Sequence, residues 1–129
     1  MRPIQKKVKS TVEYRKWFSG LTDDIAKTAV AARIGRVQNG LYGDVEPARE
    51  GVSELRIDHG QGYRVYFTES QDVFVLLLLG GNKTSQKRDI KAAQKMLKQM
   101  KQEQAKKRVD EKKAAKTKPA LQASPKSKR

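Results

Sequence analysis

The sequence contains no cysteine and only one histidine, His59, among its 129 residues. Without cysteine the chain can form no disulfide, no thiolate nucleophile and no cysteine-based zinc site. A single histidine cannot supply a pair of imidazole ligands from one chain. We therefore expect neither a metal nor another cofactor. His59 stands in the segment HGQG, whose glycines are typical of a turn, and we expect it to be a turn residue rather than a general base.

Long hydrophobic runs are also missing. The longest apolar run, Val73–Leu79, is far shorter than the roughly 20 residues that span a bilayer. The basic start MRPIQKKVKS is not followed by the apolar stretch of a secretory signal. We therefore expect a cytoplasmic protein with no membrane partner.

Acidic residues are scarce in the last third of the chain. Residues 1–82 carry 12 basic and 10 acidic side chains, whereas residues 83–129 carry 17 and 4, a net charge of +13. Such an excess favours phosphate-rich partners, nucleic acid first and an anionic membrane second, and says nothing about the fold. The apolar periodicity fades after about residue 105, and Pro119 and Pro125 follow. We predict a domain at residues 1–104 and a basic, disordered tail at residues 105–129.

Apolar spacing and capping residues predict three helices. The first begins after Thr11, and the second begins at Thr22, which two acidic residues follow. The second helix ends at Asn39-Gly40, a pair that tolerates the left-handed conformation of a helix end. Successive turns of one face of this helix are marked by Ile25, Ala29 or Val30, Arg33 or Ile34, and Val37. A third helix starts near Thr84.

The strands follow from alternating hydrophobicity. Residues 52–58 and 63–68 alternate and are joined by HGQG, which predicts a β-hairpin. Residues 73–79 do not alternate, as is typical of a central strand that is covered on both faces. Residues 4–8 are a candidate edge strand, and residues 41–51 are expected to be a loop. This order predicts an α+β fold with a small antiparallel β-sheet, N-terminal helices and a C-terminal helix.

The predicted hairpin places two arginines opposite each other. Its apolar residues must share one face, and side chains alternate along each strand, so the register must be even. The nearest such register puts Arg56 across from Arg64, and the next puts it across from Tyr66. In either register both arginines lie on the face opposite the apolar one. Two like charges in that position destabilise a sheet, so we expect an anion nearby. Either Glu54 and Asp58 neutralise the arginines, or the face binds phosphate, for which arginine offers a planar fork.

Other residues are expected at the same face. Tyr66 would lie beside the arginines as a stacking platform or a proton donor. The apolar strand leads to Gly80-Gly81, where the backbone could approach a ligand closely, and then to Lys83. A helix that starts near Thr84 would offer free N–H groups to an anion. The segment GGNKTS lacks the first glycine of a P-loop, so the sequence does not predict an ATPase.

Three separated blocks carry a family resemblance. The blocks RIGRVQNGLYGD, ELRIDHGQGYRVYF and LLLLGGNKTSQKRDIKAA occur in this order, and the likeness spans about Val12 to Gln99. They resemble the addiction-module killer proteins, which are RelE/HigB-type toxins of the RelE/ParE superfamily. The resemblance implies an antiparallel sheet flanked by helices. It also implies a metal-independent endoribonuclease that cuts mRNA on the ribosome and is held inactive by a cognate antitoxin with a helix-turn-helix DNA-binding domain.

The resemblance also implies roles for single residues. The implied catalytic residues are Arg56, Arg64 and Lys83, and the implied RNA contacts are Tyr66, Gln86 and Lys87. Arg64 would bind the phosphate, and Lys83 would stabilise charge or exchange a proton. The chain departs from the family pattern because no tyrosine or histidine follows Tyr66. Two alternatives therefore stay open: a ParE-like toxin that acts on DNA gyrase without chemistry, and a basic nucleic-acid-binding module.

Overall fold

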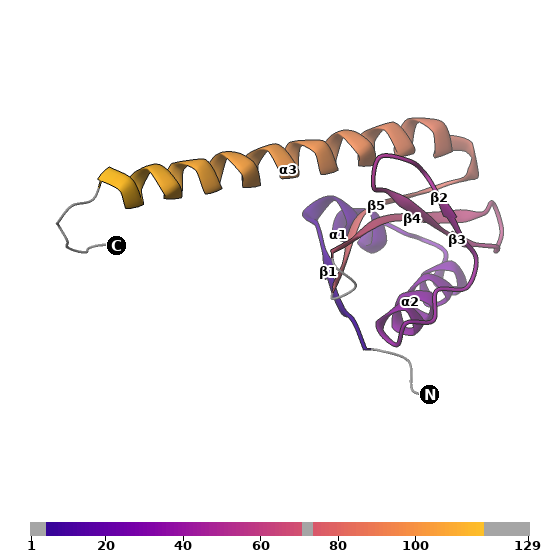
Figure 1. The fold of residues 1–129 in the computed structure, drawn as a ribbon. Helices are drawn as coiled ribbons and strands as arrows, with labels where there is room; N and C mark the ends of the chain where they lie inside the picture. The colour runs from indigo at the N-terminus through magenta and orange to yellow at the C-terminus, as the bar shows by residue number, and fades with distance from the viewer. Residues whose placement is uncertain (1–4, 71–73, 118–129) are drawn as a thin grey trace. The chain divides into compact units, whose positions relative to one another are not determined.

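The computed structural model of the chain describes residues 5–70 and 74–117, with side chains up to residue 109 (Figure 1). The chain forms two units, residues 1–97 and residues 98–129. None of the helices in the described residues could cross a membrane, because none combines the required length with sufficient apolar character. The elements, in chain order, are β1 (Lys7–Ser10), α1 (Val12–Ser19), α2 (Asp24–Gln38), β2 (Val45–Pro47), β3 (Ser53–Ile57), β4 (Tyr63–Ser70), β5 (Phe74–Asn82), a 3₁₀ turn (Lys83–Ser85) and α3 (Gln86–Thr117).

Some sequence predictions concern residues outside the described ones. These are the start of the first strand at Ile4, the connection and strand start at residues 71–73, and the tail residues 118–129. Residues 105–117, which the predicted tail also includes, are helical because α3 continues to Thr117. The domain division at residue 104 stays a prediction.

The sheet has five strands in the order β1-β5-β4-β3-β2. The β3–β4 hairpin is confirmed, and β4 pairs antiparallel with β5. However, β1 pairs parallel with β5, so the sheet is mixed rather than antiparallel as predicted. Strand periodicity carries no information on direction, because it shows only which side chains share a face. The predicted loop also contains a strand, β2, which pairs with β3. It escaped prediction because it is short and ends in Pro47, which an edge strand tolerates.

The helix starts follow from their capping residues. Thr11 caps α1 as predicted, and its side chain accepts a hydrogen bond from the backbone N–H of Tyr14. The cap of α2 is Asp23 rather than Thr22, because the Asp23 carboxylate accepts the N–H groups of the first turn. The predicted face of α2 is confirmed at Val30 and Val37 but is wrong at its first residue, since Ile25 is 68% exposed. The buried residues of α2 are Ala26, Val30 and Val37.

The glycine pair of β5 shows that helices cover both faces of the sheet. A side chain at Gly80 would overlap the Trp17 ring of α1, and one at Gly81 would overlap the Asp89 carboxylate of α3. Successive residues of a strand point to opposite faces, so α1 and the start of α3 lie on opposite faces. The absence of side chains at Gly80 and Gly81 therefore leaves space for Trp17 and Asp89. The sequence had predicted that the two glycines admit a ligand.

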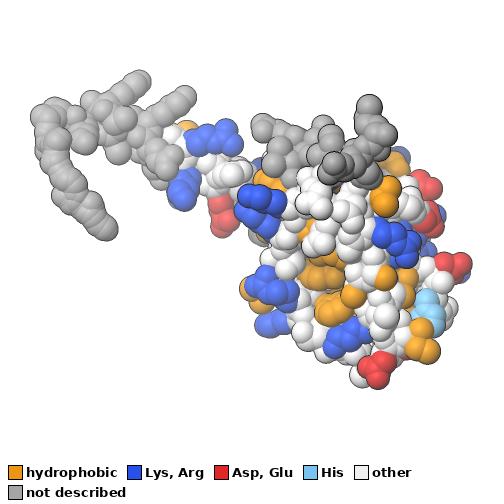
Figure 2. Space-filling view, turned by 90° about the horizontal axis from the view of Figure 1, so that it is seen from below, with side chains coloured by type: hydrophobic (Ala, Val, Ile, Leu, Met, Phe, Trp, Pro, Cys, Tyr) orange, Lys and Arg blue, Asp and Glu red, His pale blue; other side chains and the backbone are white. Residues whose placement is uncertain are grey.

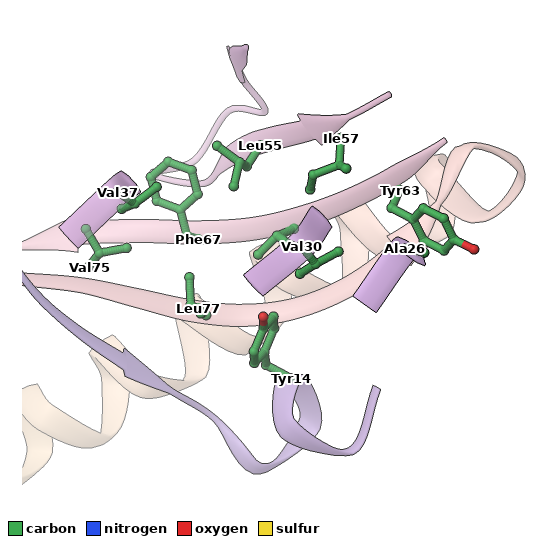
Figure 3. Close-up of a cluster of buried hydrophobic side chains, with 11 residues drawn as sticks. Tyr14, Ala26, Val30, Val37, Leu55, Ile57, Tyr63, Phe67, Val75 and Leu77 are labelled. Atoms are coloured by element: carbon green, nitrogen blue, oxygen red, sulfur yellow. The ribbon is translucent and has the colours of Figure 1, made fainter. Parts of the chain in front are cut away.

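The face toward α1 and α2 contains the hydrophobic core (Figure 3). Side chains of α1 and α2 meet the apolar side of β3, β4 and β5 there, as the alternation of the hairpin predicts. The core residues drawn from the three strands are Leu55, Ile57, Tyr63, Val65, Phe67, Val75 and Leu77. The alternate residues of the same strands therefore point to the other face, where the candidate site lies.

Candidate phosphate-binding site

The predicted pair of arginines is confirmed in register. Arg56 lies directly across from Arg64, and Arg64 lies across from Gly81 of β5. Because directly paired residues point to the same face, both arginines share the face on which Gly81 meets Asp89. The Arg56 side chain is 37% exposed and the Arg64 side chain 12%. This face therefore contains two guanidinium groups, and one of them is nearly buried.

A single buried carboxylate, Glu54, pairs with both arginines. Glu54 is 3% exposed, and its two oxygens lie 3.1 Å from Nε of Arg56 and 3.5 Å from Nε of Arg64. The hydrogen bond to Glu54 raises the pKa of Arg56. Asp58, the other predicted partner, is exposed and forms no ion pair among the described residues. Nη1 of Arg56 also lies 3.9 Å from the exposed Glu46 carboxylate, so two carboxylates accompany the two arginines.

The Nε of Arg64 forms an ion pair with Glu54 but no hydrogen bond. It is the one buried side-chain nitrogen or oxygen without a hydrogen-bond partner in the described part of the chain. Nη1 of Arg64 donates to the backbone carbonyl of Tyr63 at 3.3 Å. Buried donors are almost always paired, and an exception calls for an explanation. The Glu54 carboxylate, 3.5 Å from this Nε, is its ion-pair partner, so a phosphate would be bound through the Nη groups of the guanidinium.

Tyr66 lies on the predicted face but is fully buried, with an exposed fraction of 0%. Its hydroxyl donates to Glu54 at 3.4 Å. Burial, and secondarily the nearby Glu54 carboxylate, raises the pKa of this hydroxyl. An RNA base cannot stack on a ring without an exposed face, so the structure does not support the predicted stacking platform. The alternation of β4 assigned Tyr66 to the correct face but carried no sign that the face is covered.

Gln86 and Lys87, the other predicted RNA contacts, occupy different environments. The Gln86 side-chain nitrogen donates to Glu54 at 2.6 Å, which ties the start of α3 to the arginine cluster. Lys87 is exposed. Gln86 is therefore a fourth hydrogen-bonding or ionic partner of the Glu54 carboxylate, beside Arg56, Arg64 and Tyr66.

Lys83 lies next to Arg64. A Cβ built at Gly62 would lie 3.5 Å from Nη1 of Arg64 and 3.5 Å from Cβ of Lys83, so the two side chains flank one point. The backbone N–H of Lys83 donates to the Gly62 carbonyl at 2.9 Å, which fixes this approach. Gly62 has a φ of +78°, a conformation that favours glycine. The structure thus brings together the three predicted catalytic residues Arg56, Arg64 and Lys83.

The predicted anion site at the helix start is already occupied. The side-chain oxygen of Asn82 accepts the N–H groups of Thr84 and Ser85 at 3.0 and 3.2 Å. Ser85 returns the contact, because the Asn82 N–H donates to its hydroxyl. This arrangement is a capping box. The sequence already contained its signal, which is a capping residue followed three positions later by a polar partner.

Sequence reasoning assigned no role to Asp89. This carboxylate is buried on α3, accepts a hydrogen bond from the Ser85 hydroxyl and lies 3.7 Å from Nε of Arg88. Its spacing to the buried Ala93 and Leu97 was the available signal, because the three residues share one helical face. Asp89 also lies against Gly81 of β5, so it brings the start of α3 close to the sheet.

His59 lies in the β3–β4 turn, as predicted. Its Nε2 is 3.3 Å from the Asp23 carboxylate, and its ring stacks on Tyr63 with centroids 6.5 Å apart. Among the described residues no group of histidine or acidic side chains could hold a metal ion. The candidate site thus consists of arginine, lysine, glutamate and glutamine side chains.

The chain has the α+β fold of RelE-type toxins. Its structure is similar to a chain in the crystal structure of the RelBE2 toxin–antitoxin complex from Mycobacterium tuberculosis. The TM-score is 0.50 over 62% of this chain and 100% of that chain, at 19% sequence identity. At this identity the likeness concerns the fold alone.

In sequence, the chain is similar to a curated protein of Haemophilus influenzae that is described as uncharacterized. The two are 46% identical over 86 residues, which cover 67% of this chain and 87% of the relative. The chain belongs to the family of this Haemophilus influenzae protein. No protein-family model matches the sequence.

Proposed function

We propose that the protein is the toxin of a type II toxin–antitoxin system and that it inhibits translation as a ribosome-dependent mRNA endoribonuclease. The observation that carries this proposal is the register of the β3–β4 hairpin, which places Arg56 directly across from the nearly buried Arg64. Lys83 lies beside Arg64, so the site offers several cations to one phosphate. The shared fold with a chain of a toxin–antitoxin complex supports the same conclusion.

The chemistry that suits these residues is transesterification of RNA. The ribose 2′-oxygen attacks the adjacent phosphorus while the bond from phosphorus to the 5′-oxygen breaks, which leaves a 2′,3′-cyclic phosphate and a 5′-hydroxyl. Negative charge increases on the phosphoryl oxygens, where Arg64 and Arg56 stabilise it. Lys83 gives a proton to the departing 5′-oxygen, and the proton of the 2′-hydroxyl passes to solvent or to a ribosomal group. Glu54 holds both guanidinium groups in place.

A toxin of this type needs a partner that keeps it inactive. The proposed partner is a cognate antitoxin with a helix-turn-helix DNA-binding domain, and the proposed targets are the ribosome and mRNA. These targets would be met in the cytoplasm. The cluster of Arg56, Arg64 and Lys83 is also a suitable place for an acidic antitoxin segment, which would compete with the RNA phosphate.

A second candidate is a toxin that binds DNA gyrase and catalyses no reaction. The observation in its favour is that two candidates for general acid–base catalysis already contact carboxylates. The hydroxyl of Tyr66 is buried against Glu54, and His59 is paired with Asp23. Such a toxin would cause a DNA damage response without cuts in mRNA. A nucleic-acid-binding module without toxicity would cause neither.

The test is to induce the chain in a bacterial host without its antitoxin and to map mRNA 5′ ends by primer extension. Arg64→Ala removes the cation, Arg64→Lys keeps the charge but not the fork, and Arg36→Ala removes an exposed arginine of α2 as a matched control. We expect new ends within codons for wild type and Arg36→Ala. One stabilising donor is worth about 10²–10³ in rate. Arg64→Ala should therefore abolish the new 5′ ends, and Arg64→Lys should leave weak residual cleavage.

Circular dichroism and thermal melting of the purified variants would show whether they fold. Full cleavage by a folded Arg64→Ala variant would contradict the proposed site. Growth arrest without new 5′ ends in wild type would favour the gyrase-type toxin.

A further inference from the structure

The first turns of α3 have a buried side and an exposed side that is rich in lysine. The buried side chains are Asp89, Ala93 and Leu97, one every four residues. Three exposed lysines have the same spacing but are displaced by two positions: Lys87, Lys91 and Lys95. Two positions correspond to about 200° around a helix, so these lysines lie on the side opposite the buried residues. We name Lys87, Lys91 and Lys95 the lysine row.

The lysine row has no carboxylate partner among the described residues. None of its members is in an ion pair there. Asp89, the acidic residue of these turns, points to the sheet and contacts Ser85. Like charges four residues apart destabilise a helix. An external anion would therefore stabilise this row as well as bind to it.

The composition around the row indicates a nucleic acid rather than a protein. Between residues 87 and 95 the exposed positions are Lys87, Arg88, Lys91, Ala92 and Lys95. A protein interface is centred on apolar and aromatic side chains, and this surface exposes none of them apart from one alanine. Exposed basic residues also occur elsewhere, including Lys106, Lys107 and Arg108, and Figure 2 shows Lys and Arg side chains at several places on one face of the molecule. A regular row of cations without an apolar centre matches a phosphate backbone.

We propose that the lysine row binds the phosphate backbone of single-stranded RNA that extends from the arginine cluster. This inference rests on the proposed function. The row begins at Lys87, one residue after Gln86, whose side chain contacts Glu54. Lysines four residues apart are separated by about 6 Å along the helix axis, the same order as neighbouring phosphates along an RNA strand. Lysine offers a point charge, so binding by this row is independent of base sequence.

The experiment measures binding separately from cleavage. The probe is a fluorescently labelled single-stranded RNA of mixed sequence with 2′-O-methyl riboses, which lacks the attacking hydroxyl but keeps every phosphate. Anisotropy gives the dissociation constant of the full chain over a range of salt concentrations. The test variant is Lys91→Gln with Lys95→Gln, and the matched control is Lys7→Gln with Lys16→Gln, which removes two exposed lysines from β1 and α1. Glutamine keeps the helix propensity of lysine.

The row variant should lose roughly tenfold or more in affinity near 0.1 M salt, and the slope of log affinity against log salt should fall by about 1.4, since each phosphate contact on a single strand contributes about 0.7. The control should keep the wild-type slope. An unchanged slope in the row variant, or equal losses in both variants, would overturn the assignment. Loss of antitoxin binding with unchanged RNA binding would overturn it as well.

The two proposals fail in different ways. If wild type makes no cuts in mRNA but the row variant loses its salt slope, the proposed function fails and the RNA-binding row stands. If wild type cuts mRNA and the row variant keeps the wild-type slope, the row fails and the proposed function stands.

Discussion

The two faces of the sheet contain different kinds of buried interaction, as two neighbouring residues of β3 show. Leu55 is buried in the apolar core with α1 and α2, whereas Glu54 is buried on the other face with two arginines. Apolar burial stabilises a fold directly. A buried ion pair is often neutral or worse than an apolar pair of similar size, because desolvation offsets its attraction. The charged face is therefore explained better by binding than by stability.

The largest expected effects come from truncating these two neighbours. Leu55→Ala should cost about 2–5 kcal/mol of unfolding free energy because it leaves a cavity in the core. Glu54→Ala should cost about 3–5 kcal/mol because Arg64 is then buried without a carboxylate. Urea denaturation at neutral pH measures both values. If the two substitutions destabilise the protein equally, the causes still differ, because one leaves a cavity and the other leaves a buried charge without a partner. A further variant separates these causes.

That variant is Glu54→Leu combined with Arg64→Met, which removes the buried charges and keeps the volume. It should recover most of the stability lost in Glu54→Ala, and it should remain inactive in the growth-arrest assay. A double variant as unstable as Glu54→Ala would mean that the ion pair is required for folding, and the contrast between the two faces would then disappear.

Alkaline pH offers a second comparison of the faces. Burial raises the pKa of Tyr14, on the core face, from its ordinary value of 10.0 to about 12. A pKa raised by folding means that the protonated form is favoured in the native state. Its stabilising contribution is therefore complete below pH 10 and is lost as the pH rises to about 12, roughly 2–3 kcal/mol.

Urea denaturation of wild type and Tyr14→Phe between about pH 9 and pH 12 checks this expectation. The unfolding free energy of Tyr14→Phe should fall less steeply. The raised pKa of Tyr66 acts with the same sign on the charged face, so some alkaline loss should remain in this variant. Identical pH profiles for wild type and Tyr14→Phe would contradict the assignment to Tyr14.

The smallest effect should come from Tyr66→Phe. Its hydroxyl contacts Glu54 at 3.4 Å, a long hydrogen bond, while Gln86 contacts the same oxygen at 2.6 Å. The loss in unfolding free energy should be about 0.5–1.5 kcal/mol. Growth arrest and mRNA cleavage should persist because the hydroxyl is buried and has no access to RNA. A folded but inactive Tyr66→Phe variant would make Tyr66 the proton donor after all.

Local patterns in the sequence were sufficient for much of this protein. Alternation identified the hairpin and, through register parity, the opposition of Arg56 and Arg64. Capping chemistry identified the start of α1 at Thr11. These features depend on neighbours along the chain or across one hairpin, where periodicity and side-chain chemistry are decisive.

Tertiary structure alone decided what lies over the charged face. The start of α3 covers that face, so Tyr66 is buried and Gln86 reaches Glu54, and Gly81 admits Asp89 where a ligand was expected. The parallel pairing of β1 with β5 was also decided at this level. Periodicity shows which side chains share a face, but whether a distant helix covers that face depends on contacts between segments far apart in the sequence.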